Sequence, residues 1–256
     1  MIFYFSGCGN SKHVAETLSA GLNDKLIFIP EATREKLYDY DLGENESLGF
    51  VFPIYAWAPP QLVLDFIEKL QIDRPRYLYF ACTCGDECGH TEKIFRKAVE
   101  AKGWKLSACF SMKMPETYIG MPGFKLDSEK NAQLKIDRAD DIMMRNIPRL
   151  IDKECFSEMT VGRFAWLKSY AVNPMFNRFA TNDSKYRVDL KCTGCGECAK
   201  VCPLKNIKLV KDEPVWEGNC TMCMACYHHC PGNHIQYGKA TVGKGQYYFG
   251  KKLRWK

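Results

Sequence analysis

The sequence lacks any long hydrophobic run. Residues 1–5 are apolar, but Ser6 and Gly7 interrupt them and no basic segment precedes them. A transmembrane helix needs about 20 consecutive apolar residues, and a secretory signal joins a basic start to an apolar segment. We therefore expect neither a membrane span nor a signal peptide.

Two nucleotide-binding motifs are also missing. The glycine-containing loop at residues 6–11 has neither the lysine of a P-loop nor the G-x-G-x-x-G of a dinucleotide-binding turn. This disfavours nucleoside triphosphates and NAD as ligands. No acid–base pair and no nucleophile can be named from the residues either, so we assign no catalytic residue.

Cysteine, in contrast, is abundant, with 14 among the 256 residues. Eight of them form two copies of the spacing C-x2-C-x2-C-x3-C-P, which begin 28 residues apart. The first copy contains Cys192, Cys195, Cys198 and Cys202, and the second contains Cys220, Cys223, Cys226 and Cys230. This doubled run is the ligand pattern of a bacterial ferredoxin with two 4Fe-4S clusters.

The spacing also predicts which cysteines share a cluster. Three cysteines at two-residue gaps wrap a short loop around three corners of one cube, and the fourth thiolate ligates the other cube because it cannot reach the first. The expected ligand sets are Cys192, Cys195 and Cys198 with Cys230, and Cys220, Cys223 and Cys226 with Cys202. The alternative is a zinc site or a disulfide framework, but zinc modules pair two knuckles instead of repeating a cysteine triplet followed by Cys-Pro.

The positive charge is concentrated in the cysteine-rich part of the chain. Residues 185–256 carry 13 Lys and Arg against 5 Asp and Glu, whereas residues 1–184 carry 23 against 25. Each cluster with four thiolates adds roughly −2, which cancels about half of this excess. We therefore expect a solvated surface or a docking face for a redox partner protein, and no nucleic-acid binding. So many reduced thiols indicate a cytoplasmic protein.

Strand-like and helix-like segments alternate along the first part of the chain. Strands are expected at residues 1–5, 25–29, 47–52, 77–82 and 105–111, with helices at 12–22, 61–70 and 91–102. Such alternation predicts a parallel sheet whose ligand loops gather at the carboxyl ends of the strands. Three unusual loops follow such strands, at residues 6–11, 53–60 and 83–90.

Two of these loops favour a ligand. A loop of small residues before a helix N-terminus directs unpaired N–H groups and the positive end of the helix dipole at an anion. The second loop places Tyr55 and Trp57 between prolines, and large aromatic side chains in a loop invite a planar ligand. An ordinary strand–helix turn and a loop that only covers the core are the alternatives.

These stretches carry a resemblance to a known family. The sequence FSGCGNSKHVAETL, from Phe5 to Leu18, resembles the FMN-phosphate loop of flavodoxins. Together with FPIYAWAPP, from Phe52 to Pro60, and the two cysteine runs, it makes the chain resemble the flavodoxin–ferredoxin fusion proteins of anaerobic microbes nearly end to end. The resemblance implies an α/β fold with a flavodoxin-like five-stranded parallel sheet of order 2-1-3-4-5 and a small α+β ferredoxin domain.

The resemblance also implies FMN as a cofactor. The residues that it assigns to FMN are Ser6, Gly7, Cys8, Gly9, Asn10 and Ser11 for the phosphate, Pro53, Ile54, Tyr55, Ala56 and Trp57 beside the isoalloxazine, and Thr83, Cys84, Gly85 and Asp86 in the opposite loop. The expected domains are 1–155 for FMN, 156–184 as a helical linker, 185–237 for the two clusters and 238–256 as a basic tail.

The chain departs from the flavodoxin pattern at two places. Cys8 stands where a threonine usually binds a phosphate oxygen, and a thiol is only a weak donor. The third loop has no tyrosine to stack on the outer face of the flavin. That face is then left for the ferredoxin domain or for another molecule.

Two further stretches leave alternatives open. The third loop and the end of the strand before it contain Cys82, Cys84, Cys88 and His90. We expect these residues to be part of the packed interior, with Cys82 directed into the core, and the alternatives are a metal site and reactive thiols. Residues 127–154 are expected to be helical, with Pro148 kinking or dividing the helix. The aromatic residues of segment 161–180 are expected to pack the linker against one or both domains, and a membrane-surface helix is the alternative.

The sequence therefore favours electron transfer between two 4Fe-4S clusters and an FMN in one chain, with a redox partner protein. One alternative is a ferredoxin-linked flavin reductase that acts on a small acceptor. Another is a docking module that carries clusters and a vestigial flavin site.

Overall fold

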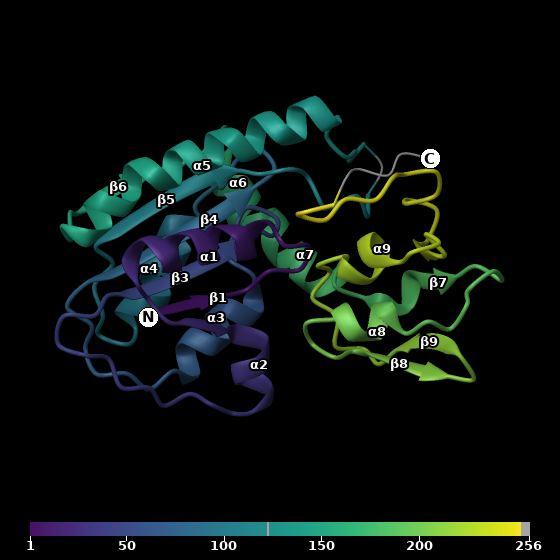
Figure 1. Ribbon diagram of the computed structural model, residues 1–256, viewed down its shortest axis with the longest axis horizontal. Helices are drawn as coiled ribbons and strands as arrows, with labels where there is room; N and C mark the ends of the chain where they lie inside the picture. The colour runs from purple at the N-terminus through teal and green to yellow at the C-terminus, as the bar shows by residue number, and fades with distance from the viewer. Residues whose placement is uncertain (122, 252–256) are drawn as a thin grey trace.

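The fold is that of a computed structural model, which describes residues 1–121 and 123–251. Figure 1 shows a sheet flanked by helices in one half of the molecule and a smaller part built of short elements in the other. The chain passes between them through α6 and α7.

The larger part is a six-stranded parallel sheet of order β2-β1-β3-β4-β5-β6. Its strands are β1 (Ile2–Tyr4), β2 (Leu26–Phe28), β3 (Leu48–Pro53), β4 (Leu78–Cys84), β5 (Ala108–Lys113) and β6 (Phe156–Glu158). The α/β class, the parallel sheet and the order 2-1-3-4-5 are confirmed.

The predicted strand number of five is wrong, because β6 adds a sixth strand beside β5. It pairs Phe156 with Ala108 and Glu158 with Phe110. Three residues of mixed polarity give no periodic signal, so this strand depends on the edge that β5 offers and not on its own sequence. Arg149 also holds it, with its guanidinium 3.7 Å from the centre of the Phe156 ring and an ion pair of 2.7 Å to Glu158.

Helices cover both faces of the sheet. Their bounds are α1 (Asn10–Leu22), α2 (Ile29–Arg34), α3 (Gln61–Lys69), α4 (Thr91–Glu100) and α5 (Glu129–Ile151). Buried side chains from α1 and α5 pack on one face, and those from α2, α3 and α4 pack on the other. Every residue of β4 is buried, as expected for a central parallel strand.

Helix α5 is not divided at Pro148. It continues to Ile151, and Pro148 lies within its last turn. A proline removes one hydrogen bond and its ring crowds the carbonyl four residues earlier, but so near the end of the helix few turns remain to be disrupted.

The smaller part consists of short elements. They are η2 (Asp183–Lys185), β7 (Tyr186–Val188), α8 (Glu197–Val201), β8 (Ile207–Val210), β9 (Glu213–Trp216), α9 (Ala225–His229) and β10 (Ile235–Tyr237). Strand β8 pairs with β9 in an antiparallel hairpin, and β7 pairs with β10. The hairpin turns at Lys211 and Asp212, which lie in the left-handed backbone region at φ 51° and 64°.

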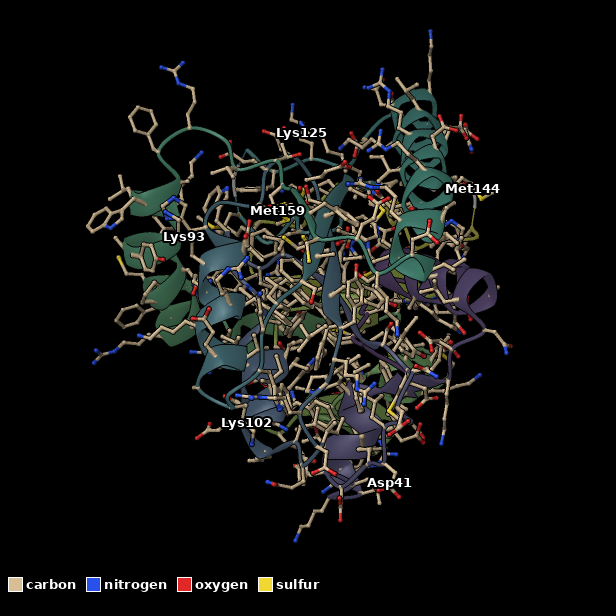
Figure 2. All side chains as sticks on the ribbon, turned by 90° about the vertical axis from the view of Figure 1, so that its left-hand side faces the viewer. Asp41, Lys93, Lys102, Lys125, Met144 and Met159 are labelled. Atoms are coloured by element: carbon tan, nitrogen blue, oxygen red, sulfur yellow. The ribbon has the colours of Figure 1, made fainter. Side chains whose placement is uncertain are left out.

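The linker helix runs through α6 (Ala165–Leu167), the π-helical turn η1 (Lys168–Val172) and α7 (Asn173–Phe179). The expectation that its aromatic residues pack inward is wrong for most of them, because Phe164, Trp166 and Phe179 are each more than 60% exposed. Only Phe176 turns toward the interior, where its ring centre lies 5.8 Å from that of Tyr118. Figure 2 shows this helix on the outside of the molecule.

Within the part of the chain that the structure describes, no helix combines the length and the apolar character needed to cross a membrane.

Candidate cofactor sites

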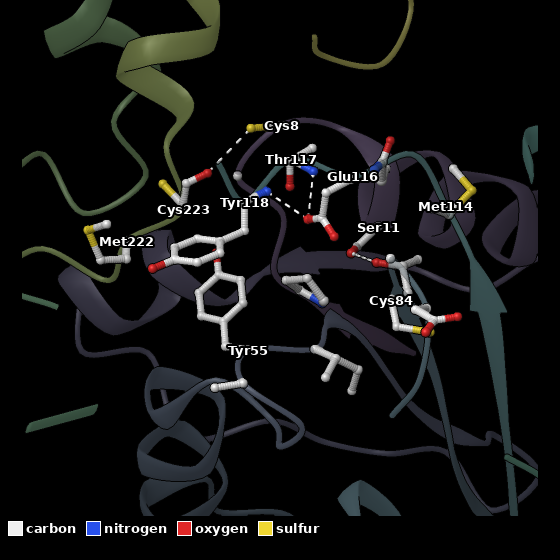
Figure 3. A pocket seen from close by; sticks show the side chains of 18 of the residues that line it. Cys8, Ser11, Tyr55, Cys84, Met114, Glu116, Thr117, Tyr118, Met222 and Cys223 are labelled. Carbon is white, nitrogen blue, oxygen red and sulfur yellow. Dashed lines mark hydrogen bonds between the residues drawn. The ribbon is translucent and has the colours of Figure 1, made fainter. Parts of the chain in front are cut away.

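A cavity of about 280 Å³ opens at the carboxyl ends of the sheet strands (Figure 3). All three loops singled out in the sequence line it. Of the fifteen residues expected to bind FMN, all except Gly9 lie in its wall: Ser6, Gly7, Cys8, Asn10, Ser11, Pro53, Ile54, Tyr55, Ala56, Trp57, Thr83, Cys84, Gly85 and Asp86. The structure therefore gathers segments that are far apart in the sequence around one space.

The first loop ends at the N-terminus of α1. Gly9 precedes the helix with a φ of 95°, a conformation that favours glycine, and no side chain caps the helix. Ser6 Oγ accepts the N–H of Gly9 at 3.1 Å, which closes the loop on itself. Asn10 is fixed from both sides, since its Nδ2 donates to the Pro115 carbonyl and its Oδ1 accepts from the Tyr247 hydroxyl, each at 2.8 Å. An uncapped helix start beside a cavity is suited to an anion.

The second loop is held in a strained shape by the linker helix. Ala56 and Trp57 have φ values of 46° and 63°, which are unusual for residues with side chains. Ser169 Oγ donates to the Trp57 carbonyl at 2.7 Å, and Asn173 Nδ2 donates to the Tyr55 carbonyl at 2.9 Å. These bonds satisfy the loop carbonyls and keep the aromatic wall of the cavity in place.

A fourth loop also lines the cavity, and the sequence did not lead us to predict it. It follows β5 and contributes Met114, Pro115, Glu116, Thr117 and Tyr118. Burial raises the pKa of Glu116, whose Oε1 accepts the N–H groups of Thr117 and Tyr118 at 3.0 and 2.8 Å. Its place after the fifth strand could have indicated it, because this segment leaves the sheet at the same edge as the other three loops.

Tyr118 lies on the side of the cavity that faces the cysteine runs (Figure 3). Its ring packs edge-on against Phe124 and Phe176, with ring centres 5.4 and 5.8 Å away. Met222 and Cys223 of the smaller part also line the cavity. The loop after β5 thus places an aromatic side chain in the cavity wall, where the third loop has none.

The third-loop cysteines contact one another in the interior. Cys82 and Cys88 are fully buried, with their Sγ atoms 3.8 Å apart, and the Sγ atoms of Cys88 and Cys84 are 3.4 Å apart. Burial raises the pKa of Cys82, while hydrogen bonding with the thiols of Cys82 and Cys84 lowers the pKa of Cys88. Across residues 1–121 and 123–251, no three His, Cys, Asp or Glu side chains converge as they would on a single metal ion. Cys82 is in the core, as expected.

A second, smaller cavity lies among cysteines of both runs. Its wall contains Cys202, Cys220, Cys223 and Cys226, the four thiols predicted to share one cluster. A 4Fe-4S cube takes one thiolate at each of four irons, so its ligands surround a space and do not meet at one ion.

The donor atoms around this second cavity fit an iron–sulfur cluster. The Tyr186 hydroxyl and Trp216 Nε1 are buried without a partner, and both residues line the cavity. The backbone N–H groups of Asn206 and Met222 donate to Cys202 Sγ and Cys220 Sγ, each at 3.3 Å. Hydrogen bonds to sulfur are one of the means by which a protein tunes cluster potential.

The other four cysteines are also neighbours. Burial raises the pKa of Cys198 to about 11, and the nearby thiols of Cys230, Cys192 and Cys195 add to the shift. The N–H of His234 donates to Cys230 Sγ at 3.2 Å. Each run therefore lends its fourth cysteine to the neighbourhood of the other run.

The two cavities share one wall at Cys223, which lines both. Cys8 Sγ donates to the Cys223 carbonyl at 3.4 Å, and burial raises the pKa of Cys8 well above that of a free thiol. A Cβ on Gly7 would lie 2.5 Å from Cys223 Cβ, which leaves no room for a side chain there. The residue that departs from the flavodoxin pattern at position 8 thus contacts the cysteine loop.

The tail after β10 joins this contact. The Phe249 N–H donates to the Cys8 carbonyl at 2.8 Å, and the Phe249 ring stacks on His13 with centres 4.2 Å apart. Lys244 Nζ donates to the carbonyls of Ile119, Met121 and Phe124. Within the expected basic tail of residues 238–256, the part up to residue 251 therefore ties the smaller part to the loops of the larger one, and residues 252–256 lie outside the described residues.

Residues 184–243 match the model of one family, the 4Fe-4S dicluster domain. The match covers less than half of the chain. No curated protein matches the chain in sequence.

Several solved structures resemble the larger part. A putative flavoprotein from Bacteroides uniformis has 14% identity, with 54% of this chain and 96% of that chain covered and a TM-score of 0.35. The Trp repressor binding protein of Bacillus subtilis has 14% identity, with 54% of this chain and 95% of that chain covered and a TM-score of 0.35. An FMN-dependent NADH-azoreductase from Bacillus anthracis, in complex with FMN, has 10% identity, with 59% of this chain and 98% of that chain covered and a TM-score of 0.35. With TM-scores this low the likeness carries no argument, and the fold rests on the strand order. The chain joins a flavodoxin-like α/β domain to a smaller part that matches the 4Fe-4S dicluster domain and lies against the loops of the larger cavity.

Proposed function

We propose that this chain is an electron-transfer protein that binds one FMN and two 4Fe-4S clusters and exchanges electrons with a redox partner protein. The observation that carries the proposal is the position of Cys223. This expected cluster ligand also forms part of the wall of the expected flavin cavity.

The loops around the larger cavity would hold FMN in two ways. The uncapped start of α1 and residues 6–11 suit the phosphate, because a helix N-terminus presents free N–H groups and positive dipole charge. Tyr55, Trp57 and Tyr118 offer apolar and aromatic surface to the ring system. We extend the expected FMN residues by Glu116, Thr117 and Tyr118.

The cluster ligands of the proposal are the two predicted sets. Cys220, Cys223, Cys226 and Cys202 surround the cavity nearer to the flavin loops, and Cys192, Cys195, Cys198 and Cys230 hold the second cluster. When bound, the clusters transfer single electrons and FMN accepts one or two. The chain positions these groups, excludes water and donates N–H groups to the sulfur atoms.

The contact between Cys8 and Cys223 would keep the two redox sites together. Gly7 permits the close approach, the Cys8 thiol donates across the contact, and Tyr247 and Phe249 brace the first loop from the far side. The flavin reductase alternative requires an outer flavin face open to small acceptors. Tyr118 and Met222 line that side of the cavity, which favours exchange with the nearer cluster instead.

Composition and electron capacity test this proposal. Anaerobically reconstituted protein should contain about eight iron atoms and one FMN per chain. A reductive titration should take up about four electrons, one for each cluster and two for the flavin. An iron content of about eight per chain without bound flavin at any FMN concentration would favour the alternative of a docking module. Turnover of small acceptors faster than free FMN would favour the reductase.

A further inference from the structure

The linker helix carries an exposed apolar surface that internal packing does not explain. We call it the aromatic ridge, and its residues are Phe164, Trp166, Leu167, Tyr170, Met175 and Phe179. Each of these side chains is between 44% and 71% exposed. Isolated exposed apolar residues are ordinary, but six on one short helical segment form a contiguous feature that marks an interaction site.

The helix is attached to the molecule by its polar side. Ser169 and Asn173 are buried and donate to the carbonyls of Trp57 and Tyr55, and Ser169 Oγ also accepts the His90 N–H at 2.8 Å. An amphipathic helix of a globular protein normally turns its apolar stripe to the core and its polar face to water. In this helix Ala165 and Phe176 pack inward beside the two polar residues, but the six apolar residues of the ridge face outward.

The charged residues within the segment that carries the ridge are all basic. Residues 159–182 contain Arg163, Lys168 and Arg178 but no Asp or Glu. Lys168 is paired with Glu87. Arg163 and Arg178 stand at opposite ends of the segment, each within 6 Å of an aromatic ring, at 5.7 Å from Phe164 and 5.3 Å from Phe179. Lys93 of α4 lies beside the same helix (Figure 2).

We propose that the aromatic ridge docks this protein on an anionic membrane surface, with α6, η1 and α7 lying in the interface. Helices that bind there present Trp, Phe and Leu to the acyl boundary and Lys or Arg to the headgroups. An anionic lipid headgroup complements Arg163 and Arg178, for which no carboxylate lies in the segment. The ridge stands on the outside of the molecule (Figure 2), and a bilayer receives such a ridge without a matching groove.

The test is co-sedimentation of the full-length protein, reconstituted with its cofactors, with two kinds of vesicle. One contains equal parts of phosphatidylcholine and phosphatidylglycerol, and the other contains phosphatidylcholine alone. We expect binding to the mixed vesicles that weakens as salt is added and is much weaker on the neutral ones. Absence of binding to the mixed vesicles, or equal binding to both, would overturn the proposal.

Three variants separate the contributions. Phe164→Ser, Trp166→Ser and Phe179→Ser together should weaken binding to the mixed vesicles by at least about a hundredfold, because three large apolar side chains no longer leave water. Arg163→Gln with Arg178→Gln should weaken it by about 25-fold, roughly fivefold for each basic residue near an anionic surface. Met144→Ser with Ile151→Ser is the matched control, since both residues are exposed on α5, and its binding should equal that of the wild type.

Two further outcomes would contradict the proposal. One is a triple serine variant that is folded by circular dichroism and binds the mixed vesicles as tightly as the wild type. The other is a wild-type dimer in light scattering that the triple variant loses. In that case a second copy of the chain covers the ridge.

Discussion

The two halves of this molecule are stabilised in different ways. The sheet domain has apolar cores on both faces, and its central strand β4 is buried along its whole length. In the dicluster domain, helices and strands are five residues or shorter, and Cys198, Cys226 and Cys230 belong to the buried core itself. A domain of this size is only marginally stable on its apolar burial, and metal ligation commonly adds to its stability. We therefore expect the sheet domain to fold around its apolar side chains and residues 184–243 to depend on iron–sulfur ligation.

Iron removal should separate the two halves most strongly. After chelation of the iron under anaerobic conditions, we expect residues 184–243 to become sensitive to protease while the sheet domain stays resistant. Limited proteolysis followed by mass spectrometry measures both regions in one sample. Continued protection of residues 184–243 in iron-free protein would show that the apolar contacts suffice, and the contrast between the halves would fail.

Loss of one ligand should remove one cluster. Cys223→Ser is expected to lower the iron content from about eight to about four per chain, since a serine replaces one of the thiolates that hold the nearer cluster. Cys155→Ser is the control, because Cys155 is exposed and belongs to neither run. If Cys223→Ser keeps all of the iron, the ligand assignment is wrong.

A methyl group at position 7 should loosen the contact between the two parts without replacing a cluster ligand. Gly7→Ala places a Cβ within 2.5 Å of Cys223 Cβ, and such overpacking costs about 1–3 kcal/mol. We expect a lower free energy of unfolding and slower reduction of the flavin by the clusters, with unchanged iron content. In Gly43→Ala the nearest atom to the new Cβ is 3.4 Å away, so this variant should behave as the wild type. Equal stability of the two variants would argue against a tight contact.

The smallest effect is expected at Glu116. Burial raises the pKa of its carboxyl, so the folded protein binds this proton more readily than the unfolded chain does, and the stabilisation is lost as the pH rises through the folded-state pKa. Glu116→Gln keeps an oxygen for the N–H groups of Thr117 and Tyr118 and carries no charge. Its free energy of unfolding at pH 7 should exceed that of the wild type, and the difference should shrink as the pH falls through the folded-state pKa toward the ordinary value of 4.5. A constant difference at all pH values would contradict this cause.

Local spacing is what made the sequence informative. The cysteine runs and the loops after the strands at residues 1–5, 47–52 and 77–82 are short segments whose chemistry depends on near neighbours, and the structure gathers them as expected. The parallel order also follows from the alternation of strands and helices. That part of the fold and of the candidate sites could be predicted from the sequence.

What could not be read depends on contacts far apart in the chain. Strand β6 exists because β5 has a free edge, and Tyr118 reaches the cavity through the path of the loop after β5. The outward turn of the aromatic ridge depends on two hydrogen bonds from Ser169 and Asn173 to the second loop. Periodicity indicates that a helix has two faces, but the partners of each face decide which one is buried.

The central claim is that Cys223 forms a wall shared by the flavin cavity and the nearer cluster. Electron paramagnetic resonance of partly reduced protein tests it most directly, because an unpaired electron on the flavin relaxes faster when a paramagnetic cluster is close. We expect a flavin radical whose signal saturates only at high microwave power and whose relaxation slows in the Cys223→Ser variant. A radical that relaxes like an isolated flavin in wild-type protein with both clusters reduced would contradict the shared wall.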